Sequence, residues 1–480
     1  MTTPADTLAD LITASTDWPP RHAADAWRQV TEWQAFREAN SDLLNQITPF
    51  TRDNDCGYIA DPLPAKISQA FADLLYGEDP DIDPGSEHDA DSLAAIVDDN
   101  DLPSELQAAA DIQSSEGEVW WRLLIDPEQA DRPLIRFLSR TQVIPLIRGR
   151  RPVAVAFVFV IEHADNEDRV TRLIEIHGPG EVRNHLFTGT ASTLGHPVPL
   201  EQHPATADLT ETWEHGLPML AGRIVNRLGR SAQLGVSDYA GVRDLLLALN
   251  ETVSIGQHNA RLTLRKRVIV PSRFLDQNGN FPAGADVIVA HDTDTDPDKP
   301  GQGLAQVEWN FDADAFISYK RELETTIIAR VGLTPQLVGM ATADGGSQAL
   351  TGPAIKLRYL PATLTAEGKA RSWDDQLPVI LSLAQRLDAL PQNMGGFGRQ
   401  WTDPETPPSV KRAPVLPEDD GEEAKRHVTL VTGEIESRRT AIETLHPDWS
   451  TARVDEEIAR IHDDQRLAPG ADIFPQPSAA

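Results

Sequence analysis

An α+β fold is what the sequence predicts, because helical and strand patterns occupy separate stretches of the chain. Apolar residues recur at helical spacing in residues 23–40 and 67–76. From residue 117 to residue 187 the pattern changes to short β-rich runs separated by turn signals. Two long helical patterns, 238–266 and 312–332, then flank a short stretch of strand character. This order predicts a mixed body and a separate pair of long helices.

The composition excludes several classes of protein. The 480 residues include 43 basic and 74 acidic side chains, so the formal net charge is −31. This charge argues against a protein that coats DNA, which needs a positive surface, but allows one that lets DNA slide past. Cys56 is the single cysteine, which excludes an internal disulfide and a cysteine zinc cluster and favours a reducing cytoplasm. No apolar run approaches the roughly 20 residues that span a bilayer, and the N-terminus lacks a basic signal segment, so we expect no membrane partner.

The first part of the chain is predicted to be helical, then acidic. Ala23–Asn40 and Ile67–Tyr76 read as helices, and Gly77 is a signal for the end of the second. Glu78–Glu118 holds fourteen Asp or Glu and no Lys or Arg. We expect this acidic stretch to be a solvated loop with one short helix near Ser92–Val97.

Strands are predicted next, and they end in a segment with the composition of loops. The expected strands are Val119–Ile125, Arg136–Val143, Val153–Ile161 and Val170–Ile176. Residues 188–236 contain many prolines and glycines and are expected to be mostly loop.

The helical pattern 238–266 is the clearest in the chain. Ser237 or Asp238 is the expected N-cap, and one apolar stripe is formed by Val242, Leu245, Leu246, Leu249 and Val253. Two short strands, 268–271 and 285–290, follow, joined by the turn signal Asp276–Gly279. The second long helix, Asp312–Val331, ends at Gly332. A pair of helices around a compact β insertion would project that insertion away from the body.

The remainder of the chain is predicted to be a loop followed by helices. Residues 334–352 have the composition of an exposed loop. A helical stretch starts near Pro353, with Pro361 and Pro378 as expected kinks. A linker at 391–423 then precedes amphipathic helices up to residue 464.

The chain carries no sequence motif of a known catalytic site. It has no HExxH, no GxSxG and no Walker lysine motif, so we expect no enzyme, no catalytic residue, no metal and no cofactor. An alternating acidic run, Asp292, Asp294, Asp296 and Asp298, has the oxygen ligands that calcium prefers. It lacks the EF-hand glycine and the closing glutamate, so a solvated loop is favoured. A metal-dependent hydrolase or nuclease that uses this run stays as an alternative.

Several segments, in their order along the chain, resemble the portal proteins of tailed bacteriophages. Ile59–Pro80 resembles an early helix that ends in an aromatic-Gly-x-x-Pro turn, and Gly117–Asp126 is similar to the first body strand. The other matching segments are Asp238–Lys266, Ile327–Pro335, Thr351–Leu357 and Gly433–Thr440. The sequence departs from the family signature at Thr351, where the family has serine, and at the inserted Pro353.

The resemblance implies a dodecameric ring at one capsid vertex of a virion, assembled in the host cytoplasm. Double-stranded DNA would pass through the ring without sequence specificity, and its protein partners would be terminase, major capsid and scaffold proteins, and then a head-completion or tail adaptor. The implied regions are a wing (1–237 and 353–412), a two-helix stem (238–266 and 312–332), a small β-containing clip (267–311), a tunnel loop (333–352) and a helical crown with the C-terminal tail (413–480). Another structural virion component is a further alternative.

The resemblance also indicates which residues would lie near DNA. The expected tunnel-loop residues are Thr342, Asp344, Gly345, Gly346, Ser347 and Gln348. The basic residues of the stem and clip are Arg261, Arg265, Lys266, Arg267 and Arg273. These cations either lie near the lumen or pair with acidic residues of a neighbouring subunit, and the sequence favours neither reading.

Overall fold

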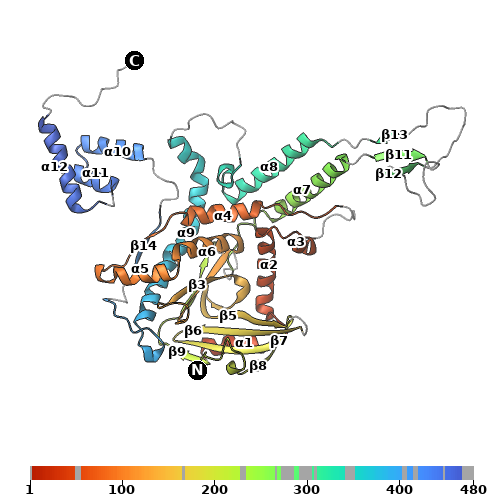
Figure 1. The fold of residues 1–480 in the computed structure, drawn as a ribbon, viewed down its shortest axis with the longest axis horizontal. Helices are drawn as coiled ribbons and strands as arrows, with labels where there is room; N and C mark the ends of the chain where they lie inside the picture. Colours follow the sequence, from red (N-terminus) through yellow and green to blue (C-terminus); the bar gives the residue numbers. More distant parts are fainter. Residues whose placement is uncertain are drawn as a thin grey trace, which may run out of the picture. The chain divides into compact units, whose positions relative to one another are not determined.

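The computed structural model describes residues 3–48, 56–164, 168–227, 234–264, 267–271, 286–290, 305–307, 311–340, 352–402, 408–413, 420–446 and 449–467. The chain divides into a large unit, Met1–Gly346 with Tyr359–Ala413, and a small unit, Ser347–Arg358 with Pro414–Ala480. Helices and mostly antiparallel sheets occupy separate stretches of the chain (Figure 1), so the predicted α+β class is confirmed.

Most of the helices lie in the large unit. They are α1 (Pro4–Thr13), α2 (Arg21–Arg37), α3 (Ser41–Ile47), α4 (Leu63–Tyr76), α5 (Ala90–Asp99), α6 (Leu102–Glu116), α7 (Arg243–Leu264), α8 (Ala313–Val331) and most of α9 (Gly352–Ala389). Pro361 and Pro378 lie inside α9, which continues past both of them.

The described strands form four sheets. The largest has the order β4 (Val143–Arg148), β5 (Arg151–Ala164), β6 (Arg169–Gly178), β7 (Glu181–Thr190) and β8 (Thr193–Val198), with β9 (Thr212–Glu214) also paired to β7. A second sheet has the order β10 (Ala221–Val225), β2 (Glu118–Leu124) and β3 (Leu134–Leu138). Two smaller sheets pair β1 (Asp81–Asp83) with β14 (Ser409–Lys411), and β11 (Arg267–Pro271) with β12 (Asp286–Ala290) and β13 (Ala305–Val307).

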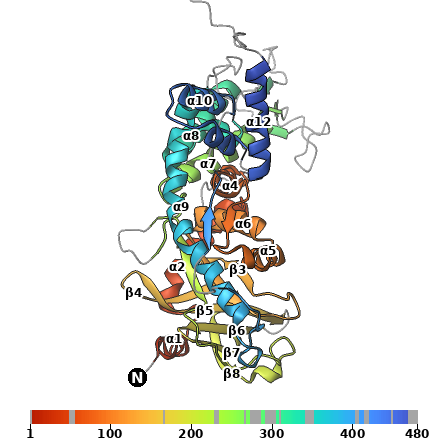
Figure 2. The ribbon, with the colours of Figure 1, turned by 90° about the vertical axis from the view of Figure 1, so that its left-hand side faces the viewer.

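Apolar side chains join these layers into contiguous cores. Leu8 and Ile12 of α1 are buried against the largest sheet. Trp373 of α9 is fully buried in a core shared with α6 and β2, where its ring lies 5.1 Å from that of Tyr76. α9 therefore packs lengthwise against the second sheet (Figure 2).

Three expectations for the body were wrong. The single strand expected at Arg136–Val143 does not form, because β3 ends at Leu138, a 3-10 turn covers Arg140–Gln142, and β4 begins at Val143. The acidic stretch is not one short helix in a loop, because α5 is followed by α6, whose last residues, including Glu116, are buried. The segment 188–236 is not mainly loop, because it contains β8, β9 and β10, and β10 pairs with β2 in register from Ala221 with Arg122 to Val225 with Glu118. The predicted strands at 119–125, 153–161 and 170–176 are confirmed with small shifts in their ends.

The two long helices stand side by side, with β11, β12 and β13 at their far end (Figure 1). Asp312 caps α8 by accepting a bond from the Ala315 N–H at 3.0 Å, and Gly332 ends it in the left-handed region with φ of 88°. The expected apolar stripe of α7 is confirmed, with Val242, Leu246 and Leu249 buried.

The start of α7 and the pairing of β11 differ from expectation. α7 begins at Arg243, and Ser237 accepts a bond from the Tyr239 N–H at 3.0 Å before the helix, so neither Ser237 nor Asp238 is its N-cap. β11 pairs with β12 in parallel, which excludes the expected hairpin because a tight turn joins only antiparallel strands. The turn signal itself lies outside the described residues.

The small unit contains the amphipathic helices expected near the C-terminus, which the structure shows as α10 (Asp420–Thr432), α11 (Arg438–Leu445) and α12 (Thr451–Leu467). Ser437 caps α11 by accepting from the Thr440 N–H at 3.1 Å, and Arg439 pairs with Asp455 at 3.0 Å. Among the helices of the described residues, none combines the length and the apolar character that crossing a membrane requires.

The contact between Gly256 of α7 and Phe316 of α8 provides a test of how the two helices pack. A Cβ added at Gly256 would lie 2.1 Å from Cε2 of Phe316, so we expect Gly256→Ala to lower the free energy of unfolding by about 1–2 kcal/mol. The matched control is Gly368→Ala in α9, where an added Cβ meets nothing within 4 Å. That change should stabilise the protein by up to about 1 kcal/mol. Urea unfolding measures the free energy of unfolding of each variant. Equal stabilisation of the protein by the two substitutions would contradict the close contact between Gly256 and Phe316.

Candidate functional site

A buried ion cluster lies where α6 runs into β2. The Glu118 carboxylate lies 3.1 Å from Nε of Arg140 and 2.9 Å from Nη1 of Arg223, and all three side chains are buried. Trp120 donates its indole N–H to the same carboxylate at 3.1 Å. Burial and charge pairing in this dry environment hold β2, β10 and the segment before β4 in one arrangement.

A second buried pair joins α9 to the segment before α7. Lys369 lies 2.5 Å from Oδ2 of Asp238, and it also donates to the Asn226 side chain at 2.6 Å. Asp238 accepts further bonds from Ser114 at 2.6 Å and from Asn226 at 3.0 Å. Burial lowers the pKa of the Lys369 ammonium, and the adjacent Asp238 carboxylate opposes that shift. The carboxylate of Asp238 thus neutralises the buried Lys369 ammonium and does not cap α7.

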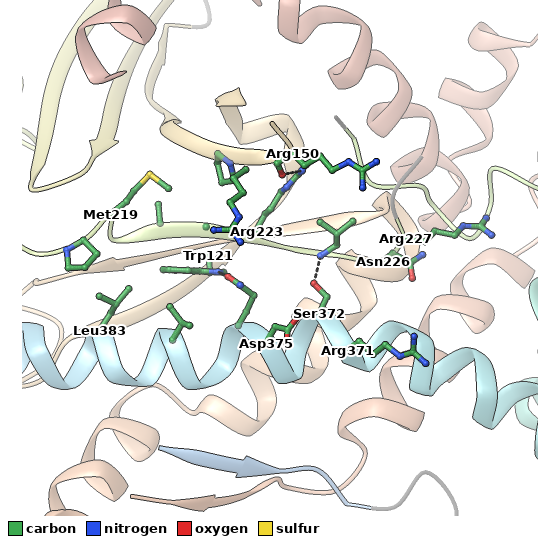
Figure 3. A pocket seen from close by; sticks show the side chains of 18 of the residues that line it. Trp121, Arg150, Met219, Arg223, Asn226, Arg227, Arg371, Ser372, Asp375 and Leu383 are labelled. Carbon is green, nitrogen blue, oxygen red and sulfur yellow. Dashed lines mark hydrogen bonds between the residues drawn. The ribbon is translucent and has the colours of Figure 1, made fainter. Parts of the chain in front are cut away.

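Beside these clusters, a pocket of about 700 Å³ lies between β2, β10 and α9 (Figure 3). Gly222 makes room for the indole of Trp121, because a Cβ there would lie 2.5 Å from the ring. Ser372 of α9 accepts a bond from the Val225 N–H at 2.9 Å, which fixes the helix against β10 at this point. The pocket is thus built on buried, hydrogen-bonded elements.

The lining of this pocket is basic at one end and apolar at the other. Figure 3 places Met219 and Leu383 toward one end, and Arg227 and Arg371 toward the other. Five arginines line it in total, namely Arg150, Arg151, Arg223, Arg227 and Arg371, against the single carboxylate of Asp375. In a chain of net charge −31 this is a marked local concentration of cations.

The arginines of the pocket differ in how they are held. Arg223 is buried and paired with Glu118, and its Nη2 donates to the backbone carbonyl of Arg150 at 3.1 Å. Arg150, Arg151 and Arg371 are exposed and form no salt bridge with any of the described residues. The pocket therefore presents guanidinium groups that no described carboxylate pairs with, and guanidinium groups can bind a carboxylate or a phosphate through two parallel hydrogen bonds.

Of the residues expected near DNA, Arg261 and Arg267 lie in the described part of the chain, so the expected DNA-contacting set stays a prediction. Arg261 is exposed in the last turn of α7, and Arg267 begins β11. The remaining expected residues lie outside the described part of the chain: Arg265, Lys266, Arg273, Thr342, Asp344, Gly345, Gly346, Ser347 and Gln348. The acidic run Asp292–Asp298 lies outside it as well, and no metal-binding group of three or more His, Cys, Asp or Glu occurs among the described residues.

Sequence reasoning missed the arginine-lined pocket. Its arginines come from positions as far apart as 150 and 371, and only the fold brings them together. The one local signal is the run Arg148-Gly149-Arg150-Arg151, which lies between two of the predicted strands and is typical of a turn.

Comparisons with known proteins give a remote likeness. No family model matches the chain, and no curated protein matches it. Among solved structures, one similar chain comes from the "neck of empty GTA particle computed with C6 symmetry". It is 11% identical, covers 90% of this chain and 95% of its own length, and superposes with a TM-score of 0.44.

The buried pair supports a stability test. Replacing Lys369 by Met leaves Asp238 charged and buried without its counter-ion, so we expect a loss of about 3–5 kcal/mol in the free energy of unfolding. The matched control is Arg371→Met, two residues along the same helix and exposed, which should change it by less than about 0.5 kcal/mol. Denaturant unfolding measures the free energy of unfolding of each variant. If both substitutions change it by a similar small amount, the Lys369–Asp238 pair does not hold α9 in place.

Proposed function

We propose that this chain is a phage portal subunit, which forms a ring at one capsid vertex of a virion and provides the channel for DNA packaging, retention and ejection. The observation that carries the proposal is the pair α7 and α8 lying side by side with β11, β12 and β13 at their far end. These elements coincide with the stem and clip that the sequence resemblance implies at 238–332. The proposal assigns the chain no catalytic step, so terminase would supply the packaging work.

The charge of the chain supports the same proposal. A subunit of net charge −31, repeated around a ring, gives a channel that repels phosphate overall and lets DNA slide. Exposed Arg261 near the end of α7 would moderate that repulsion locally. In this proposal the large unit supplies wing, stem and clip, and the helices of the small unit supply the crown. Capsid, scaffold and adaptor proteins would bind the outer surfaces.

Ring formation is the direct test of the proposal. Purified protein examined by negative-stain electron microscopy and native mass spectrometry should give closed rings with a central hole, with twelve subunits in assembled capsids. Co-expression with capsid and scaffold proteins provides the control for assembly that needs the shell. A monomer under both conditions, or the protein distributed over the whole shell, would contradict the proposal.

The tunnel-loop assignment gives a second test. Deletion of residues Ala343–Ser347 should leave ring assembly unchanged and lower the yield of DNA-filled particles at least tenfold, because the loop would contact DNA and not the neighbouring subunits. Electron microscopy counts the rings, and nuclease-protected DNA measures packaging. A matched control deletes the same number of residues from the C-terminal tail. Failed assembly together with normal packaging in the residual rings would show that the assignment is wrong.

A further inference from the structure

The turn between β4 and β5 presents three cations. Arg148, Arg150 and Arg151 are exposed and form no salt bridge with the described residues. Gly149 and Arg150 both have positive φ, 55° and 76°, as the tight hairpin turn of a twisted sheet requires. The Arg150 carbonyl is fixed by Arg223, which is itself paired with buried Glu118. We name Arg148–Arg151 the arginine turn; it is a tight turn with three exposed guanidinium groups.

An acidic pocket of about 350 Å³ lies elsewhere on the large unit. Three exposed carboxylates line it, those of Asp79, Asp98 and Asp101. Apolar residues complete the lining: Pro80, Ile82, Val97, Leu102 and Pro103. None of the three carboxylates forms a salt bridge with a described residue. Asp101 precedes α6 with φ of 44° and makes no side-chain cap bond. The hollow therefore combines unpaired negative charge with an apolar floor, which suits the aliphatic stem and charged head of an arginine.

The arginine turn and the acidic pocket lie on different sides of the large unit. In Figure 2, β4 and α5 are on opposite sides of α9, and the arginine turn follows β4 while Asp98 belongs to α5. Such a separation prevents the two from meeting within one chain. It allows them to meet between chains in a head-to-tail contact, and that is the kind of contact from which rings close.

We propose that the arginine turn of one copy docks into the acidic pocket of the next copy of this chain. This inference rests on the proposed ring. Opposite charge supports it: a turn with three exposed cations would face a hollow with three exposed carboxylates. Bidentate arginine–carboxylate pairs fix the register of the two copies and steer their association, while the larger surfaces around them supply most of the buried area. Arg150 and Arg151 also line the arginine-lined pocket, which adds Arg227 and Arg371 to the same positive surface.

Cysteine cross-linking tests the contact whether or not closed rings form. In a Cys56→Ala background, Arg151→Cys and Asp98→Cys in the same chain should produce a ladder of covalent multimers on mild oxidation, read on a non-reducing gel. Each single cysteine should give no ladder. A matched control pairs Arg151→Cys with Ser192→Cys, an exposed site on the β7–β8 turn, and should also give none.

Charge reversal tests the pairing by a second route. Arg150→Glu with Arg151→Glu should raise the concentration needed for assembly at least tenfold, as should Asp79→Lys with Asp98→Lys, since each sets like charges against each other. All four changes in one chain set two glutamates against two lysines and so restore opposite charges at the reversed positions, and the assembly concentration should return to within about threefold of the original. Circular dichroism checks that each variant is folded, and wild-type assembly should weaken as salt increases.

The outcomes separate this inference from the portal proposal. Rings without a specific ladder would overturn the contact and leave the ring. A ladder without closed rings would support the contact and overturn the portal. Neither ladder nor rings would overturn both. Arginine variants that assemble normally but lose affinity for duplex DNA would show that the turn binds phosphate, which would overturn the contact.

Discussion

The arrangement of the large unit depends on buried charges that pair with one another. Asp238 and Lys369 neutralise each other at 2.5 Å, and Asn226 and Ser114 satisfy the remaining atoms. An unpaired charge in such a place is costly, so alternative packings of α9 against the segment before α7 are disfavoured. Glu118 likewise fixes the packing of β2 against β10, because its buried carboxylate pairs with Arg140 and Arg223. The polar contacts of Asp238 therefore fix the segment that leads into α7.

Signals that lie close together in the sequence made some elements predictable. α8 carries its cap, its apolar positions and its terminal glycine within about twenty residues, and its ends agree with the sequence analysis. The stripe of α7 is equally local. β10 is different, because its strand character comes from pairing with β2, about a hundred residues away, and its own sequence contains Gly222 where the Trp121 ring passes. Composition alone therefore favoured a loop.

The same distinction applies to the charged residues. The sequence showed acidic and basic stretches but not which charges become buried. Glu116 and Glu118 end an acidic run that we interpreted as solvated, yet both are buried, and burial raises the pKa of Glu116 while bonds from Gln34 and Ser139 oppose that shift. The arginine-lined pocket likewise needs α9 beside β10 before Arg371 and Arg150 can share it. Their separation in sequence is too large for any spacing rule to reveal.

Net charge then links assembly to function in the proposed ring. In such a ring, copies of a subunit with net charge −31 would repel one another, and acidic residues along the channel would keep DNA from adhering to it. If cations were spread evenly over the subunit, the repulsion between subunits and the repulsion of DNA would both decrease. Concentrating them at a few places, such as the arginine turn and the pocket beside it, lowers the repulsion only where two copies would meet. Because ions screen exposed charges beyond about 10 Å at 0.1 M salt, a cation at such a contact leaves the potential of a distant channel wall largely unchanged. A strongly acidic subunit can in this way associate with itself and still repel DNA.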